Sequence, residues 1–230
     1  MSDTNTDAEH VHVQWKPSLK MIKVEREARR HMLGSDDEFK RAFEILDRHP
    51  KRVTFFGSAR DLPHNESYRE AARNLAYQLA KRDYAIVSGG GGGIMAASNK
   101  GAYDAGGVSI GFNIQLPHEQ HLNPFTTENL AFHYFFTRKV MMTFFSHAYV
   151  YFPGGFGTLD ELTEIITLIQ TKKMPPLRIV LFGHDYWDDF DAFIKKQLLG
   201  NGYISERDDA IYTITDDVTA AVHLIDCGRS

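Results

Sequence analysis

The residues that are best suited to chemistry by their type and spacing lie in one short segment, Pro153–Glu161, which reads PGGFGTLDE. It follows the apolar run Ala148–Phe152 and precedes a stretch with Leu and Ile at helical spacing. Glycines at the start of a helix leave backbone N–H groups free to bind an anion, and a threonine hydroxyl adds a donor. The segment therefore predicts an anion site that involves Gly154, Gly155, Gly157 and Thr158.

The acidic residues of this segment allow two interpretations. Glu161 would project from the first turn of the helix into the crevice that holds the anion. The spacing of Thr158 and Glu161 also matches a capping box, in which the carboxylate only accepts a hydrogen bond from a backbone N–H. Spacing alone favours neither interpretation. Glu164 follows one helical turn later on nearly the same face, where it lines the pocket or lies at its solvent edge.

A second glycine-rich segment, Ser88–Met95, contains five consecutive glycines and follows the apolar run Tyr84–Val87. A flexible linker is a poor interpretation, because an apolar helix follows at once. The segment matches neither the dinucleotide spacing G-x-G-x-x-G nor the ending of an ATP-binding P-loop, which argues against both classes of cofactor site. We expect instead a backbone cradle for a phosphate. Its candidate residues are Gly90, Gly91, Gly92, Gly93 and Met95.

Two further polar segments follow or precede predicted elements of the same kind. Gly57–Arg60 comes directly after an apolar run, so Ser58 and Arg60 are candidates for additional contacts to an anionic ligand. Arg138 and Lys139 lie near the start of a predicted helix. The planar guanidinium of an arginine can hold a phosphate or sugar hydroxyls. Taken alone, however, an Arg-Lys pair more often belongs to a solvated helix face.

The elements that position these segments alternate between short apolar runs and longer helical stretches from Arg52 onward. Strands that are apolar on both faces and separated by helices require a parallel sheet covered on both sides. We therefore predict a doubly wound, Rossmann-like α/β fold, whose ligands bind beyond the carboxyl ends of the strands. The predicted strands are 53–56, 84–87, 108–112, 148–152, 178–182 and 210–214, and the predicted helices are 66–82, 94–105, 136–146, 158–171, 187–199 and 216–225.

Composition limits the classes of partner and compartment. A formal net charge of -4 over 230 residues gives no net positive electrostatic field that would attract nucleic acid or an anionic membrane. The single cysteine, Cys227, allows no internal disulfide. With no signal-like start and no long apolar run, we expect a cytoplasmic protein with no membrane association. We predict a mobile tail over 1–17, a helical extension over 18–50 and the Rossmann-like domain over 51–230.

The segment Pro153–Glu161 matches the PGGxGTxxE signature of the Lonely Guy (LOG) family, and the chain resembles that family over about residues 51–225. The resemblance implies cleavage of the N-glycosidic bond of AMP or an N6-modified AMP, such as a cytokinin riboside 5′-monophosphate, to free base and ribose 5-phosphate, with no cofactor or metal. It implies Arg138 and Glu161 as the catalytic pair, the glycines of both loops and Thr158 as phosphate ligands, and a homo-oligomer that is at least a dimer. A carboxylate beside the anomeric carbon suits the positive charge that develops there.

One departure and two alternatives accompany this resemblance. Ala96 stands where many LOG proteins carry a glycine after the methionine, which bears on substrate identity. A nucleotide or molybdenum-cofactor carrier of related fold would bind such a ligand without cleaving it, although Arg138 and Glu161 together argue against this. Single-stranded DNA binding, as in DNA-processing protein A, has little support without a basic run. The aromatic residues between Phe132 and Phe145 are expected to pack in the core or on an oligomer face, unless one stacks on a base.

Overall fold

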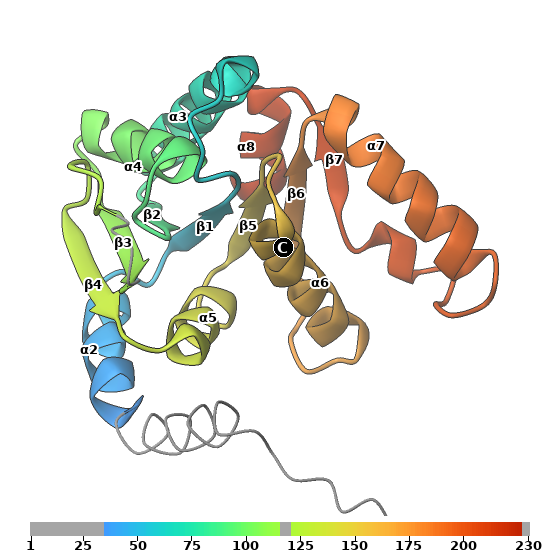
Figure 1. The fold of residues 1–230 in the computed structure, drawn as a ribbon, viewed down its shortest axis with the longest axis horizontal. Helices are drawn as coiled ribbons and strands as arrows, with labels where there is room; N and C mark the ends of the chain where they lie inside the picture. Colours follow the sequence, from blue (N-terminus) through green and yellow to red (C-terminus); the bar gives the residue numbers. More distant parts are fainter. Residues whose placement is uncertain (1–34, 116–120, 227–230) are drawn as a thin grey trace, which may run out of the picture. The chain divides into compact units, whose positions relative to one another are not determined.

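The computed structural model describes residues 35–115 and 121–226, in which seven strands form one fully parallel sheet. The strand order is β4-β3-β2-β1-β5-β6-β7, so the chain starts in the middle, builds one half outward and then returns to build the other (Figure 1). This doubly wound order confirms the predicted Rossmann-like fold. The strands are β1 (Arg52–Phe56), β2 (Ala85–Ser88), β3 (Ser109–Ile114), β4 (Glu128–Phe132), β5 (Ala148–Tyr151), β6 (Arg178–Phe182) and β7 (Thr213–Thr215).

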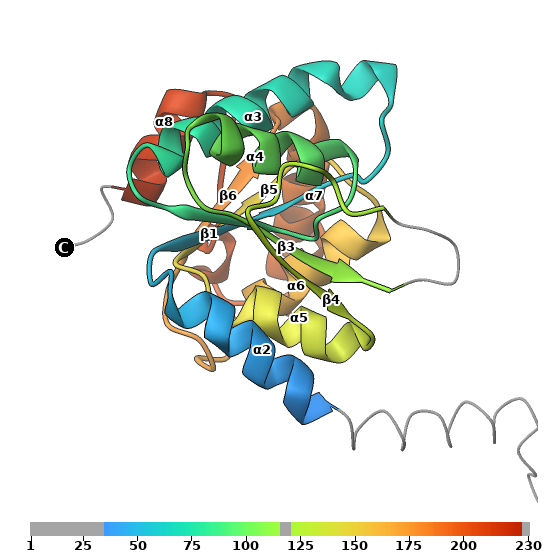
Figure 2. The same ribbon diagram turned by 90° about the vertical axis from the view of Figure 1, so that its left-hand side faces the viewer.

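Helices cover both faces of the sheet, as buried parallel strands require (Figure 2). One hydrophobic core joins the sheet to α3 (Glu66–Ala80), α4 (Gly93–Asp104) and α8 (Val218–Asp226). The other core joins it to α2 (Ser35–Asp47), α5 (Phe135–Thr143), α6 (Phe156–Gln170) and α7 (His184–Phe193). Neighbouring strand residues alternate between the two cores: Val53 and Phe55 belong to the first, and Phe56 to the second. No helix among the described residues has the length and hydropathy needed to cross a membrane.

The structure departs from the predicted elements at several ends. β4 was not predicted, because it is an edge strand that begins with Glu128 and Asn129 and leaves alternate residues exposed. The predicted helix 187–199 is α7 followed by a π-helix over Ile194–Leu199. The predicted strand 210–214 reduces to Thr213–Thr215, since Asp208–Ala210 forms a 3₁₀ turn. The predicted tail 1–17 and the first half of the extension, 18–34, lie outside the described residues; the described residues from Asp37 onward belong to one compact unit.

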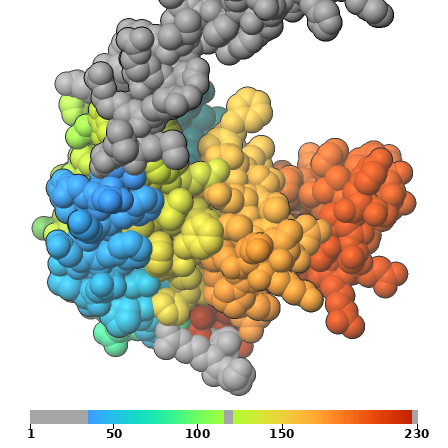
Figure 3. Space-filling view, turned by 90° about the horizontal axis from the view of Figure 1, so that it is seen from below, coloured from blue at the N-terminus to red at the C-terminus, as the bar shows by residue number. Residues whose placement is uncertain are grey.

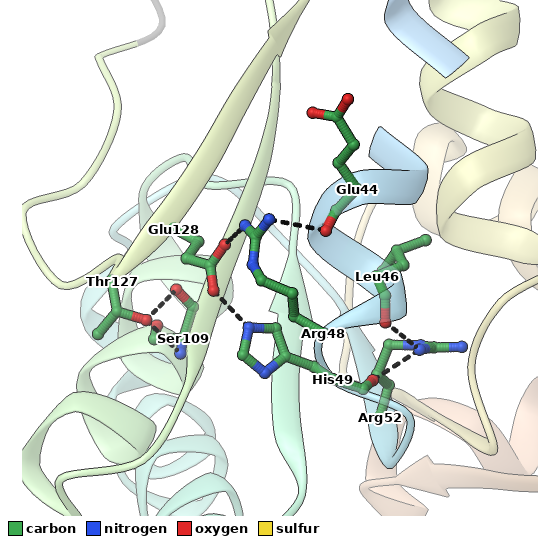
Figure 4. Close-up of polar contacts among 8 residues, drawn as sticks. All are labelled: Glu44, Leu46, Arg48, His49, Arg52, Ser109, Thr127 and Glu128. Atoms are coloured by element: carbon green, nitrogen blue, oxygen red, sulfur yellow. Dashed lines mark hydrogen bonds and ion pairs between the residues drawn. The ribbon is translucent and has the colours of Figure 1, made fainter. Parts of the chain in front are cut away.

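The segment that follows α2 is fastened to the sheet by polar contacts around Glu128 at the start of β4 (Figure 4). Arg48 and His49 both hydrogen-bond this carboxylate. Burial opposes ionisation of Glu128, but these two partners outweigh it and lower its pKa. Arg52 donates to the carbonyl oxygens of Leu46, in the last turn of α2, and His49, just beyond the helix, both at 2.6 Å. The carboxyl-terminal end of α2 and the segment after it are thus anchored to β1 and β4.

Candidate active site

The main cleft lies where the sheet changes direction, between the carboxyl ends of β1 and β5. In doubly wound sheets this switch point is the usual place for a ligand. The cleft has a volume of about 1080 Å³, which is ample for a nucleotide-sized molecule. Of the predicted site residues, the cleft brings together Ser58, Arg60, Met95, Arg138, Lys139, Gly154, Gly155, Gly157, Thr158 and Glu161.

The β5–α6 loop presents the start of α6 to this cleft. The helix begins at Phe156 after an extended Gly155, with no side-chain cap and no acidic residue in its first turn. A Cβ on Gly154 would collide with the Thr158 hydroxyl, so only glycine fits there. The Tyr186 hydroxyl donates to the Gly154 carbonyl at 2.6 Å, and the Ser58 N–H donates to the Pro153 carbonyl at 3.0 Å. The loop is therefore held from both sides, with a helix N-terminus facing the cleft.

The capping-box interpretation of Thr158 and Glu161 is wrong. α6 starts two residues earlier than predicted, which makes Gly155 the N-cap and places Thr158 inside the first turn. The Thr158 N–H donates to the Gly155 carbonyl at 3.0 Å as part of that turn. Glu161 consequently lies in the second turn, where helix backbone N–H groups already have partners. Its carboxylate is left for the cleft.

Glu161 is a buried carboxyl group in a polar surround. It is 9% exposed and lines the cleft. The Thr143 hydroxyl lies 3.5 Å from Glu161 Oε2 and 3.5 Å from Glu164 Oε2. Burial raises the pKa of Glu161 to about 7; Lys139 and Arg138 oppose this rise, while Glu164 and Asp160 add to it. A group that titrates near neutrality in a cleft is typical of catalytic carboxylates.

We expect Glu161→Gln to stabilise the fold above pH 7. Between its ordinary pKa of 4.5 and its folded pKa of about 7, the folded state holds a proton that the unfolded state has lost. Stability therefore falls as pH rises through this window, by about 3 kcal/mol in total. Glutamine never ionises, so urea unfolding at pH 8 should show a gain of about 2–3 kcal/mol that disappears near pH 4. A pH-independent difference, or a loss at pH 8, would contradict the assignment; the exposed Glu206→Gln is the control.

The Arg138 side chain extends from α5 into the cleft, where it contacts β3 and the loop after β2. Its Nε donates to the Phe112 carbonyl of β3 at 2.7 Å. A Cβ on Gly89 would overlap the Arg138 guanidinium and lie 2.6 Å from Met95 Sδ. Burial lowers the pKa of Arg138, and the charge of Glu161 opposes that change. The guanidinium and the carboxylate thus act on one another in the same cleft.

We expect Gly89→Ala to lower activity while leaving the fold in place. The added methyl group meets the ends of the Arg138 and Met95 side chains, which are flexible and can move aside. The Arg138 guanidinium is then displaced from its position in the cleft. Displacement of a substrate-orienting group by about 1 Å can cost up to about 100-fold, so with the predicted role of Arg138 we expect at least a tenfold loss of kcat. Steady-state kinetics and a thermal melt check this. Gly106→Ala is the control, since a Cβ on Gly106 meets nothing within 4 Å, although its positive φ carries its own strain.

Lys139 lies in the cleft wall, but its ammonium group already has partners. Lys139 Nζ is 2.6 Å from Asp160 Oδ2 and 3.2 Å from Glu164 Oε2. Burial alone would lower its pKa, and its acidic neighbours outweigh burial and raise it. This cluster joins α5 to α6 and holds the Glu164 carboxylate near that of Glu161, since both lie 3.5 Å from the Thr143 hydroxyl. Glu164 itself is not among the cleft-lining residues.

The glycine run Gly90–Gly93 also lies outside the cleft lining; of this loop only Gly89 and Met95 reach it. Gly90 has a φ of +69° and packs against Gly111 of β3. Gly93 has a φ of +58° and no room for a Cβ beside the Ser58 carbonyl. The Ile94 N–H donates to that same carbonyl at 3.0 Å. Close packing of the loop therefore explains why Gly90 and Gly93 must be glycines, and the role of Gly90–Gly93 as phosphate ligands stays a prediction.

Several lining residues were missed as site candidates. His64, Asn65 and Tyr68 come from the region that leads into α3, and Asp185 and Tyr186 come from α7. They carry no motif and reach the cleft only because the sheet brings these elements to one edge. Phe135 and Phe136, predicted to pack in the core or on an oligomer face unless one stacks on a base, are 62% and 43% exposed and line the cleft. No group of three or more metal-ligating side chains occurs within 35–115 and 121–226.

A profile described as "Possible lysine decarboxylase" matches residues 95–225. The "Cytokinin riboside 5'-monophosphate phosphoribohydrolase LOG" of Oryza sativa subsp. japonica is 32% identical over 168 residues, which cover 71% of this chain and 67% of that protein. The chain belongs to the LOG family. A second rice LOG protein, the "Probable cytokinin riboside 5'-monophosphate phosphoribohydrolase LOGL5", is 34% identical over 142 residues, or 60% of this chain and 57% of the relative. The chain thus spans little more than half of that LOG relative.

Solved structures share the LOG fold at greater distance. The molybdenum cofactor carrier protein of Chlamydomonas reinhardtii matches with a TM-score of 0.56 and 22% identity, over 77% of this chain and 96% of that one. At this identity the likeness shows the fold alone.

Proposed function

We propose that the protein hydrolyses the N-glycosidic bond of a purine nucleoside 5′-monophosphate, releasing free base and ribose 5-phosphate. The substrate class is AMP or an N6-modified AMP, such as the cytokinin riboside 5′-monophosphates in the names of its LOG relatives. The observation that carries the proposal is the arrangement of Glu161 and Arg138 in one cleft beside an uncapped helix N-terminus. No cofactor is needed for this reaction.

The proposed binding mode follows from the charges of the cleft. The 5′-phosphate lies at the start of α6, against Gly155, Gly157 and Thr158, because backbone N–H groups and the helix dipole favour an anion there. Ser58 and Arg60 come from the neighbouring β1 loop and border the same cleft. This mode makes the phosphate the part of the substrate that anchors the ribose.

The proposed chemistry uses Glu161 as a carboxylate. As the bond between ribose and base breaks, positive charge grows on the sugar, and a nearby carboxylate stabilises it. The same carboxylate can act on the attacking water or as a nucleophile; the geometry supports each of these roles. Arg138 orients the substrate and interacts with the leaving base. Phe135 and Phe136, exposed beside the cleft, offer faces on which a base can stack.

A substrate panel tests this proposal. AMP, isopentenyl-AMP, other common monophosphates and adenosine are incubated with the purified protein, and kcat/KM is measured for release of each base. We expect purine monophosphates to be cleaved and adenosine to react at least about 100-fold more slowly, because it lacks the group that binds α6. Equal rates for AMP and adenosine would overturn the phosphate assignment.

We also propose a homo-oligomer that is at least a dimer, as the LOG resemblance implies. Aromatic side chains on and beside α5 and α6 are unusually exposed: Phe144 is 40% and Phe156 is 92% exposed. Large apolar side chains that are exposed to this degree are common at association surfaces. Light scattering at micromolar concentration should report a dimer or larger, and a monomer would contradict this.

A further inference from the structure

The helix that carries Arg138 begins without a capping group of its own. The N-cap of α5 is Tyr134, whose side chain makes no capping hydrogen bond, and the first turn contains no acidic residue. The N–H groups in the first turn of a helix lack partners within the helix and carry partial positive charge. An acceptor from elsewhere in the chain can therefore stabilise this turn.

Glu38 of α2 places a carboxylate beside this turn from 95 residues away in the sequence; it bonds the N–H of His133, which precedes the N-cap, and a side chain of the first turn. Its side chain is buried, and Glu38 Oε1 accepts a hydrogen bond from the His133 backbone N–H at 2.6 Å. Glu38 Oε2 accepts from the hydroxyl of Thr137, which is fully buried. Thr137 Oγ1 also lies 2.9 Å from the Tyr134 carbonyl oxygen. One carboxylate thus binds both the residue that enters α5 and a residue in its first turn.

The position of Arg138 depends on this turn. Arg138 follows Thr137 directly, and its backbone N–H donates to the Tyr134 carbonyl at 3.3 Å. Beyond the backbone, its only hydrogen bond among those found in the described residues runs from Nε to the Phe112 carbonyl. A shift at the start of α5 would therefore move the guanidinium relative to Gly89 and Glu161. Figure 3 shows the face on which α2 (blue) lies beside α5 (yellow).

We propose that Glu38 is a positioning residue, through which α2 sets the place of Arg138 in the cleft. This inference rests on the proposed function, because it assigns Arg138 a part in catalysis. It gives α2, which precedes the first strand of the sheet, a role in turnover. A merely structural Glu38 would instead stabilise the fold without affecting the reaction of the folded protein.

Matched variants on α2 and the segment that follows it separate these two roles. Glu38→Ala removes the acceptor, and Glu38→Gln keeps one acceptor oxygen. Arg48→Ala removes the hydrogen bonds from Arg48 to Glu128 and to the Glu44 carbonyl, near the other end of α2. Neither of these partners belongs to α5. We expect Glu38→Ala to lower kcat about tenfold or more with KM within about twofold, Glu38→Gln to recover at least part of the loss, and Arg48→Ala to keep kcat. Thermal melts give the stability of each variant.

A second measurement needs no turnover. Amide hydrogen exchange over residues 135–139 should be faster in Glu38→Ala than in the wild type, and unchanged in Arg48→Ala. Equal kcat in the folded Glu38→Ala and Arg48→Ala variants, or unchanged exchange in α5, would overturn the inference. If the wild type released no base from any monophosphate, the proposed function would fail, and the exchange measurement would still decide whether Glu38 holds α5.

Discussion

Replacement of Glu161 by glutamine is expected to lower kcat by at least about 100-fold with little change in substrate binding. The carboxylate is buried, 9% exposed, and lies in the cleft beside the start of α6. Glutamine has nearly the same shape, so the phosphate contacts remain, but it carries no charge to oppose the one that develops on the ribose. The same change should stabilise the fold above pH 7, so loss of activity cannot be attributed to unfolding.

Two controls accompany this variant. Glu164→Gln alters the neighbouring carboxylate, which contacts Lys139 and Thr143 but does not line the cleft. It is expected to change kcat by less than about tenfold, because its charge acts on Glu161 only from a distance. The exposed Glu206→Gln should have no effect. If Glu161→Gln kept full turnover, Glu161 would have no place in the mechanism.

Replacement of Arg138 is expected to have an effect of similar size. Loss of one positioned charged contact in an active site costs about 2–4 kcal/mol in the transition state, or about 30- to 1000-fold in kcat for Arg138→Ala. Arg138→Lys keeps a positive charge but loses the planar fork and the Nε bond to the Phe112 carbonyl, so it should recover little.

Chemical rescue makes the Arg138 prediction specific. The alanine variant leaves a space between Gly89, Met95 and Phe112 that a free guanidinium ion fits. Added guanidinium chloride at millimolar levels should raise kcat of Arg138→Ala and leave Arg138→Lys and the wild type unchanged. Full activity of Arg138→Ala without rescue would remove this residue from the site.

The fold and the centre of the site could be predicted from sequence because both depend on local patterns. Apolar runs such as Val53–Phe56 identify buried parallel strands, and glycine-rich segments after such runs identify loops at the carboxyl edge. Local patterns alone could not assign roles to Arg138 and Glu161. The spacing of Glu161 fits a capping-box residue and a residue that acts on a ligand in the cleft equally well. The family signature favours a chemical role, and the early start of α6 excludes the capping box, so the catalytic role of Glu161 stays a prediction.

What could not be predicted depends on contacts between distant segments. Nothing local indicates that Gly93 packs against Ser58 and Gly90 against Gly111 while, of the five glycines, only Gly89 lines the cleft. The edge strand β4 was missed because its exposed positions carry polar residues. Tyr186, which binds the Gly154 carbonyl, and Glu38, which binds the start of α5, act across 32 and 95 residues. Such partners follow from the fold and not from any motif.

The most direct test of the central claim is to quantify free adenine and ribose 5-phosphate together after incubation of the wild-type protein with AMP. The proposed reaction predicts that both products appear in equal amounts, and that Glu161→Gln forms neither while still binding AMP. AMP that binds to the wild-type protein but is recovered intact would contradict hydrolysis. In that case the cleft would hold a nucleotide without cleaving it, and the protein would act as a carrier.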